Sequence, residues 1–162
     1  MHRIPAFESK ICAPDELAAR IAQLPRPLVF TNGVFDLLHR GHASYLAQAR
    51  ALGKSLLVAV NSDDSVRRLG KGPDRPINAQ ADRMALIAAL EAVSLVTWFD
   101  GATPLALIRL AKPEVLVKGG DWAPERIVGS AEVRSWGGTV HSIPFLHERS
   151  TSATLAKIRR DS

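Results

Sequence analysis

Residues 28–42 read LVFTNGVFDLLHRGH and predict a buried strand that runs directly into a helix. The apolar start is typical of a strand covered on both faces, and the glycines leave the backbone open where the chain turns. His39 and His42 lie three residues apart, so they share one side of the following helix. Because the first N–H groups of a helix and the positive end of its dipole attract anions, this junction is predicted to hold phosphates.

Each of these residues also has an ordinary structural interpretation. A single histidine near a helix start is usually solvated or a cap, and a glycine before a helix is usually part of a turn. Here, however, Gly33, Asp36, His39, Gly41 and His42 occur together at fixed offsets on one strand-to-helix junction. The combination therefore favours a binding site.

Five short apolar runs alternate with amphipathic stretches along the chain. The predicted strands are residues 28–31, 56–61, 95–99, 115–118 and 139–143. The predicted helices are residues 15–24, 43–52, 81–92, 104–111, 131–136 and 151–160. Continuous apolar strands separated by helices favour a mainly parallel sheet, so the expected fold class is α/β, a single Rossmann-like doubly wound domain.

Polar and charged residues gather after the predicted strands and not before them. The segments that enter strands are plain, whereas those that leave strands are residues 32–42, 61–64, 100–103, 118–122 and 147–152. In open α/β sheets, ligands bind outside the carboxyl ends of the strands. The sequence therefore predicts one site at that edge of the sheet.

Composition limits the class of protein. The 162 residues, 46% of them hydrophobic, suffice for one domain with a substantial core. The single Cys12 forms no internal disulfide, the start lacks a secretory signal, and no run reaches membrane-spanning length, so we expect a cytoplasmic protein without a membrane partner. The net charge of +5 suits anionic ligands, but the basic residues are dispersed, so a nucleic acid partner is not expected.

Two common nucleotide motifs are absent from the sequence. The first strand is not followed by G-x-G-x-x-G, so a dinucleotide cofactor is not expected. Gly53, Lys54 and Ser55 resemble the end of a P-loop, but Gln48 stands where that motif needs its first glycine. We interpret Gly53 as a helix cap followed by a solvated lysine.

Residues 33–42 resemble the G-x-F-D-x-x-H-x-G-H signature of the nucleotidyltransferase superfamily, which contains the cytidylyltransferases and pantetheine-phosphate adenylyltransferase. Within it, the chain is most similar to the adenylyltransferases that make ADP-heptose. This narrower resemblance rests on residues 75–78, 82–84, 116–122 and 149–152. It implies a nucleotidyltransferase domain over residues 26–162, preceded by an N-terminal extension, residues 1–25, with a short helix.

The resemblance implies transfer of AMP from ATP to heptose 1-phosphate, on the way to the inner core of bacterial lipopolysaccharide. The acceptor phosphate is already largely ionised at neutral pH, so the nucleophile needs no general base. Catalysis then consists of holding two anions in line and stabilising charge on the α-phosphate and the leaving pyrophosphate. ATP and Mg²⁺ are the implied small molecules, and a homodimer is the assembly considered; the metal ligands are not assigned.

The same resemblance assigns roles to individual residues. The catalytic residues it implies are His39, His42, Lys71 and Arg149. Contacts to the nucleotide are expected from Thr31, Asn32, Gly33, Phe35, Asp36, Gly41, Arg83, Lys118, Ser150 and Thr151. The sugar is expected to contact Gly119, Gly120, Asp121 and Trp122.

Some of these roles have alternatives. Asp36 is expected to hold either the loop or the metal, and Arg83 has the alternative of an ordinary surface arginine on its helix. Asp63 and Asp64 are interpreted as helix-capping acids. For the whole protein, a cytidylyltransferase acting on a polyol or sugar phosphate would share the histidine pair and prefer CTP. A nucleotide-sensing module would bind without turnover, and the intact His39, His42 and Arg149 argue against it.

Overall fold

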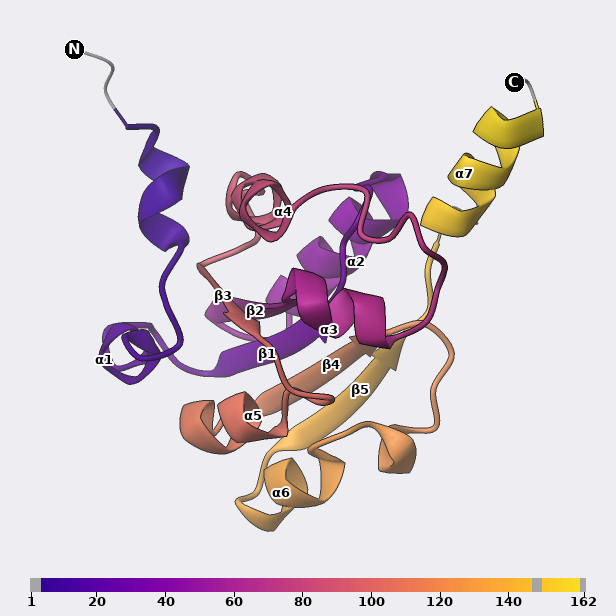
Figure 1. Cartoon of the computed structure of the whole chain (residues 1–162). Coiled ribbons are helices and arrows are strands. Elements are labelled where there is room, and N and C mark those ends of the chain that lie inside the picture. Colours follow the sequence, from indigo (N-terminus) through magenta and orange to yellow (C-terminus); the bar gives the residue numbers. More distant parts are fainter. Residues whose placement is uncertain (1–3, 147–149, 161–162) are drawn as a thin grey trace.

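The computed structural model of the chain describes residues 4–146 and 150–160 and contains one sheet of five parallel strands (Figure 1). The strands are β1 Leu28–Gly33, β2 Ser55–Asn61, β3 Leu95–Phe99, β4 Val115–Gly119 and β5 Thr139–Ile143. Their order across the sheet is β3-β2-β1-β4-β5. All five predicted strands are confirmed within two residues, and so is the Rossmann-like α/β class.

The helices of the described residues include every one that the sequence predicted. They are α1 Leu17–Ile21, α2 Arg40–Arg50, α3 Asp63–Arg68, α4 Gln80–Ala88, α5 Leu105–Ala111, α6 Ser130–Ser135 and α7 Thr151–Arg160, with two 3-10 helices, η1 Ala6–Lys10 and η2 Pro124–Arg126. Helix α2 begins three residues earlier than predicted, which moves its first turn onto the histidine pair. The sequence did not predict η1, η2 or the short α3, whose cap is Ser62 rather than either aspartate.

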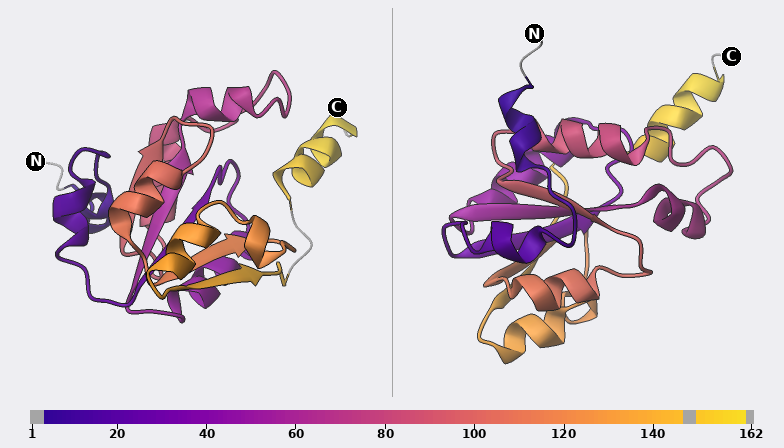
Figure 2. Two further views of the ribbon diagram at one scale, coloured as in Figure 1. Left: turned by 90° about the horizontal axis from the view of Figure 1, so that it is seen from below. Right: turned by 60° about the vertical axis from the view of Figure 1, so that its left-hand side comes forward.

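Helices cover both faces of the sheet (Figure 2), and apolar side chains fill the space between them and the strands. On one face, Tyr45 and Leu46 of α2 and Ile87 of α4 pack against β1, β2 and β3. On the other face, residues of α1, α5 and α6 pack against alternate positions of the same strands. This double cover explains why the strands read as continuous apolar runs rather than alternating ones.

The N-terminal segment packs against the edge of the sheet. Ile11 forms a parallel bridge with Val96 of β3, and the Cys12 N–H donates to the Val96 carbonyl at 2.9 Å. Leu17 and Ile21 of α1 are buried in the core. Residues before position 26 therefore contribute to the core of the domain. No helix within residues 4–146 and 150–160 combines the length and the apolar character needed to cross a bilayer.

The topology fixes where a ligand can bind. The chain goes from β1 outward to β2 and β3 and then returns to place β4 on the other side of β1. Loops that leave neighbouring strands in opposite directions open a crevice at the carboxyl ends of the strands. In this protein the crevice lies between β1 and β4, beside the loop that leads into α2.

Candidate active site

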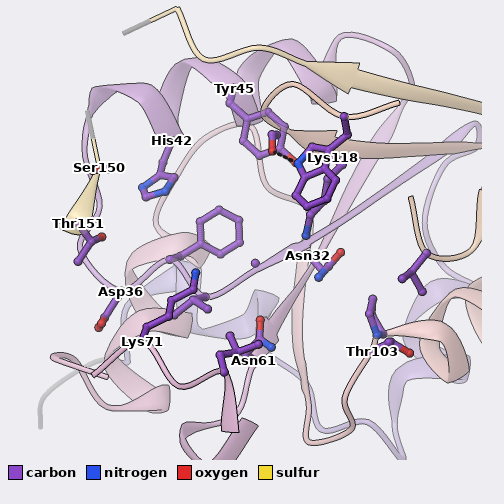
Figure 3. Close-up of a pocket in the computed structure, with 18 of the residues that line it drawn as sticks. Asn32, Asp36, His42, Tyr45, Asn61, Lys71, Thr103, Lys118, Ser150 and Thr151 are labelled. Atoms are coloured by element: carbon purple, nitrogen blue, oxygen red, sulfur yellow. Dashed lines mark hydrogen bonds between the residues drawn. The ribbon is translucent and has the colours of Figure 1, made fainter. Parts of the chain in front are cut away.

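A cavity of about 560 Å³ opens at the predicted edge of the sheet. Its wall comes from the loop between β1 and α2, from the ends of the other four strands and the loops beyond them, and from the start of α7 (Figure 3). Ligand pockets of small-molecule enzymes are typically in this size range. The carboxyl edge predicted from sequence therefore carries a cavity of suitable volume.

The two histidines lie at the start of α2. His39 is the residue that precedes the helix, in extended conformation, and His42 lies in the first turn. Their rings stack with centroids 3.8 Å apart and 19° between the ring planes, and the edge of Phe35 approaches His42 with centroids 5.3 Å apart. Because the first N–H groups of a helix have no intrahelical acceptor, the imidazoles and the helix start are together suited to bind an anion.

The protonation state of His42 follows from its surroundings. Burial lowers the pKa of His42 and the neighbouring His39 lowers it further, to about 4, although the Leu37 carbonyl favours the charged form. At neutral pH His42 is therefore uncharged in the empty site. A bound polyanion would favour the protonated ring, so binding and protonation of His42 are coupled.

Two lysines reach the same cavity from different elements. Lys118 is the next-to-last residue of β4, and Lys71 belongs to the loop between α3 and α4. Burial lowers the pKa of Lys118, and the charge of Lys71 lowers it further. The two ammonium groups repel each other at one cavity, and an anion bound between them would offset this repulsion.

Asp36 holds the loop between β1 and α2 in place. Its carboxylate accepts hydrogen bonds from Arg75 Nε at 2.5 Å, from the Ile77 N–H at 2.8 Å and from the Asn78 N–H at 2.9 Å. In return, Asn78 Nδ2 donates to the Asp36 carbonyl at 2.7 Å. Burial alone would raise the pKa of Asp36, but these N–H groups and the Arg75 guanidinium lower it overall. Of the two roles expected for Asp36, the structure supports the loop role.

The described residues contain no cluster of side chains that could bind a metal ion without the substrate. No group of three or more His, Cys, Asp or Glu side chains with suitable geometry occurs within residues 4–146 and 150–160. Asp36 has its oxygens occupied by N–H donors, as described above. A Mg²⁺ ion that arrives with a triphosphate fits this arrangement, because it is usually held by phosphate oxygens, water and few protein ligands.

Phe35 has a backbone conformation that non-glycine residues rarely adopt. Its φ is 51°, in the left-handed region, and its side chain is buried. A Cβ on Gly33 would lie 2.9 Å from Phe35 Cε2, so only glycine fits there without a shift of the ring. Strain of this kind costs about 1–3 kcal/mol and persists only where the surroundings enforce it. The Asp36 contacts and the buried Arg83 supply that enforcement.

Arg83 is buried and does not line the cavity, so the nucleotide contact expected from it stays a prediction. Its side chain is completely buried. It donates from Nε to the Asn78 carbonyl at 2.9 Å and from its terminal nitrogens to the Val34 carbonyl and to Asp63 Oδ1, both at 2.8 Å. Arg83 is therefore neither a surface arginine nor a wall residue. It fixes the carbonyl that precedes Phe35.

The other predicted residues divide into those that reach the cavity and those that do not. The wall includes Asn32, Gly33, Phe35, Asp36, His39, His42, Lys71, Lys118, Gly119, Trp122, Ser150 and Thr151. Thr31 is fully buried with its hydroxyl on Tyr45, and Gly41 is buried within the first turn of α2. Gly120 and Asp121 are not part of the wall. Arg149 lies outside the described residues.

The turn at residues 119–122 is fixed by Ser142 of β5. Ser142 Oγ donates to the Gly120 carbonyl at 2.6 Å and accepts from the Trp122 N–H at 2.9 Å. Gly120 has a φ of 112°, which favours glycine. The Trp122 ring is half exposed at the cavity wall, and its Nε1 donates to the Gly119 carbonyl at 3.2 Å.

Several wall residues were not predicted from the sequence. They are Tyr45, Asn61, Arg75, Phe99, Thr103, Arg126 and Phe145, among others. Asn61 and Thr103 fall in the strand exits at which a site was expected, so their positions carried a signal. Tyr45 and Phe145 look like core residues in sequence, and their rings meet with centroids 5.7 Å apart at the cavity. Ser150 caps α7 by accepting from the Ala153 N–H at 3.0 Å, so the predicted helix start is confirmed.

Comparison with known proteins gives a consistent picture. Residues 30–155 match the family model described as cytidylyltransferase-like. The chain is 58% identical over 156 residues to D-beta-D-heptose 1-phosphate adenylyltransferase of Bordetella bronchiseptica, covering 95% of this chain and 96% of that protein. It is 54% identical over 134 residues to the bifunctional protein HldE of Hahella chejuensis, covering 83% of this chain and 28% of that protein.

Solved structures of similar fold agree with these sequence matches. The lipopolysaccharide core biosynthesis protein from Thermoplasma volcanium superimposes with a TM-score of 0.61 at 29% identity, over 75% of this chain and 98% of that one. Pantothenate synthetase from Thermus thermophilus has a TM-score of 0.62 at 17% identity, over 94% of this chain and 70% of that one. At that identity the second likeness concerns the fold alone.

Proposed function

Because the chain belongs to the cytidylyltransferase-like family, we propose that it is a heptose 1-phosphate adenylyltransferase. It transfers AMP from ATP to D-glycero-β-D-manno-heptose 1-phosphate and releases pyrophosphate, giving ADP-heptose for the lipopolysaccharide inner core. The observation that carries the chemistry is the stacked pair of His39 and His42 at the start of α2, in one cavity with Lys71 and Lys118. The Bordetella relative, which matches along almost its whole length, supports the substrates.

The geometry accounts for the reaction without a general base. An oxygen of the acceptor phosphate attacks the α-phosphorus of ATP, the bond from that phosphorus to the bridging oxygen breaks, and pyrophosphate leaves. The histidine pair, the N–H groups at the start of α2 and the lysines face the charge that builds up. Asp36 and Arg83 keep the loop at Phe35 in the conformation that brings its backbone to the α-phosphate. Mg²⁺ bound to the triphosphate would neutralise part of its charge, and it would need few protein ligands.

A turnover screen tests this function directly. Pyrophosphate release is measured for each pairing of ATP, CTP, GTP and UTP with heptose 1-phosphate, hexose 1-phosphates and glycerol 3-phosphate. We expect ATP with heptose 1-phosphate to give the highest kcat/KM. A preference for CTP with a polyol phosphate would replace the proposal by the cytidylyltransferase alternative. Nucleotide binding without turnover on any acceptor would identify a sensing module.

Arg149 is proposed as a further contact to the triphosphate, on the strength of the sequence motif before α7. Arg149→Ala should weaken triphosphate handling, and Arg149→Lys should restore only part of the loss, because lysine lacks the forked donor geometry. We expect a loss of about ten-fold or more in kcat/KM for ATP with alanine. Steady-state kinetics with ATP varied measure it. Full recovery with lysine would indicate a simple charge effect, and no loss with alanine would remove Arg149 from the site.

Nucleotide binding should draw a proton onto His42. Without nucleotide the pKa of His42 is about 4, and the charge of bound phosphates should raise it. At a pH between these two pKa values, nucleotide binding should therefore be accompanied by proton uptake. Calorimetric ATP titrations at about pH 6 in two buffers of different ionisation enthalpy measure this uptake. His42→Gln is the matched variant, and the difference between the two proteins cancels the titration of the ATP phosphates. Equal uptake in both proteins would contradict the coupling.

Two further proposals concern the setting of the enzyme. We propose that it works in the cytoplasm, where ATP is available, and that it assembles as a homodimer. Cell fractionation tests the location, and light scattering of the purified protein tests the assembly. A monomer by light scattering would remove the homodimer and leave the proposed reaction untouched.

A further inference from the structure

The orientation of the Asn61 side chain is fixed by its neighbours. Ser65 Oγ donates its one proton to the Gly101 carbonyl at 3.3 Å. The hydrogen bond between Asn61 and Ser65 Oγ, at 3.0 Å, must therefore have the Asn61 Nδ2 group as its donor. The amide cannot turn over without losing this bond, so Asn61 Oδ1 points the other way.

That oxygen faces the cavity. Asn61 ends β2, is 7% exposed and belongs to the cavity wall. In Figure 3 its oxygen points towards the open centre of the cavity, with Asn32 and Lys71 nearby. Among the contacts of residues 4–146 and 150–160, no donor reaches Asn61 Oδ1, whereas its nitrogen donates one hydrogen bond, to Ser65 Oγ. The protein thus holds a nearly buried, correctly aimed acceptor ready for a donor from outside the chain.

The two sides of the cavity differ in chemistry. Towards β4 and β5 the wall carries the rings of Tyr45, Trp122 and Phe145, whose flat apolar faces suit a purine base. Towards β2 and β3 it carries the amide of Asn61, the hydroxyl of Thr103 and the ring of Phe99. Hydrogen-bonding groups beside one apolar surface are what a polyhydroxylated sugar ring requires. The histidine pair, which the proposed function assigns to the phosphates, belongs to the same wall.

We propose that Asn61 selects the acceptor: its Oδ1 accepts a hydrogen bond from one hydroxyl group of the sugar, which lies against the ends of β2 and β3. This proposal rests on the proposed function, since it names the part of the same cavity that takes the sugar phosphate. It also places the sugar on the side away from residues 119–122, where the family resemblance had put it. Two of those four residues, Gly120 and Asp121, lie outside the wall.

The test combines a variant with a change in the substrate. Asn61→Ala and the wild-type protein are assayed with heptose 1-phosphate and with a series of acceptors that each lack one hydroxyl group. For the wild-type protein, loss of the contacted hydroxyl should lower kcat/KM about ten-fold, because Asn61 Oδ1 is then left without a donor. For Asn61→Ala, kcat/KM for heptose 1-phosphate should fall by a similar factor. The acceptor that lacks the contacted hydroxyl should then have the same kcat/KM as heptose 1-phosphate.

Three measurements separate this role from others. Calorimetric ATP binding without sugar should be the same for Asn61→Ala and wild type, whereas a ten-fold loss would put Asn61 on the nucleotide and overturn the proposal. Gln48→Ala on the far part of α2 is the matched control and should leave kinetics and ATP binding unchanged.

Ser65→Ala, which frees the Asn61 amide to turn, should weaken discrimination between the same two acceptors, and it provides the readout even if Asn61→Ala fails to fold.

The possible failures are distinguishable. If the wild-type protein turns over no sugar 1-phosphate, the proposed function fails. If the wild-type protein makes ADP-heptose but Asn61→Ala lowers kcat/KM equally for every acceptor in the series, the role of Asn61 fails while the function stands. The proposal is supported if Asn61→Ala leaves kcat/KM unchanged for one deoxy acceptor and lowers it for the others.

Discussion

His42→Ala should lower kcat by about 100-fold or more while changing ATP affinity much less, and His39→Ala should do the same. The two rings stack at the start of α2 and line one cavity, so in the proposed reaction each stabilises the charge that develops during transfer. A donor aimed at developing charge acts in the transition state, and its loss therefore appears in kcat rather than in ground-state binding. Pyrophosphate release at saturating substrates and calorimetric ATP titration measure the two quantities.

His141 provides a matched control for this pair. It lies on β5, bonds to the Thr139 hydroxyl at 3.0 Å and is not part of the cavity wall. His141→Ala should keep kcat near the wild-type value, which separates a loss at the site from a general effect of removing an imidazole. Near-native turnover by either His39→Ala or His42→Ala would show that the cavity is not where AMP is transferred.

The fold was predictable because burial leaves a strong pattern in the sequence. Strands such as β2, buried at every position, read as unbroken apolar runs, and each is followed by a helix that covers a face. The strand exits then had to meet at one edge, so the location of the cavity followed from the parallel arrangement alone. The histidine pair was predictable because its members are three residues apart and lie in the same turn.

The contacts that hold the site were not predictable in this way. Arg83 bonds to a carbonyl 49 positions earlier in the chain, and Asp36 bonds to a segment about 40 positions later. Such pairs leave no periodic signal, because their partners meet only after the sheet has formed. From sequence, Arg83 looked like a phosphate-binding or surface cation, and Asp36 allowed two roles.

The direction of a turn is equally hidden in the sequence. Residues 118–122 were recognised as a site motif, yet only part of the motif faces the cavity. The reason is Ser142 on β5, which binds the Gly120 carbonyl and the Trp122 N–H and so sets how the turn lies. In the same way, the aim of Asn61 depends on Ser65 and on the Gly101 carbonyl, which no local pattern links to it.

Arg83→Met should lower the free energy of unfolding by about 3 kcal/mol. It should also lower kcat/KM, because the loop at Phe35 loses contacts that hold its conformation. Methionine fills a similar volume but leaves the Val34 and Asn78 carbonyls without their donor and Asp63 without its charge partner. Removing one member of a buried ion pair typically costs about 3–5 kcal/mol. The lower end applies here because the Asp63 side chain is 30% exposed and regains water. Chemical denaturation followed by circular dichroism measures the free energy of unfolding.

The comparison with Arg67 shows why burial decides this effect. Arg67 pairs with Asp64 on α3 at 2.5 Å, a shorter distance than in the Arg83 pair, yet both side chains are more than half exposed. Exposed pairs contribute about 0–1 kcal/mol, so Arg67→Met should barely change the denaturation midpoint. If Arg83 instead bound the triphosphate, Arg83→Met would keep wild-type stability and lose ATP affinity. A loss of stability in the absence of any ligand therefore separates the structural role, which fixes the carbonyl before Phe35, from direct binding of the nucleotide.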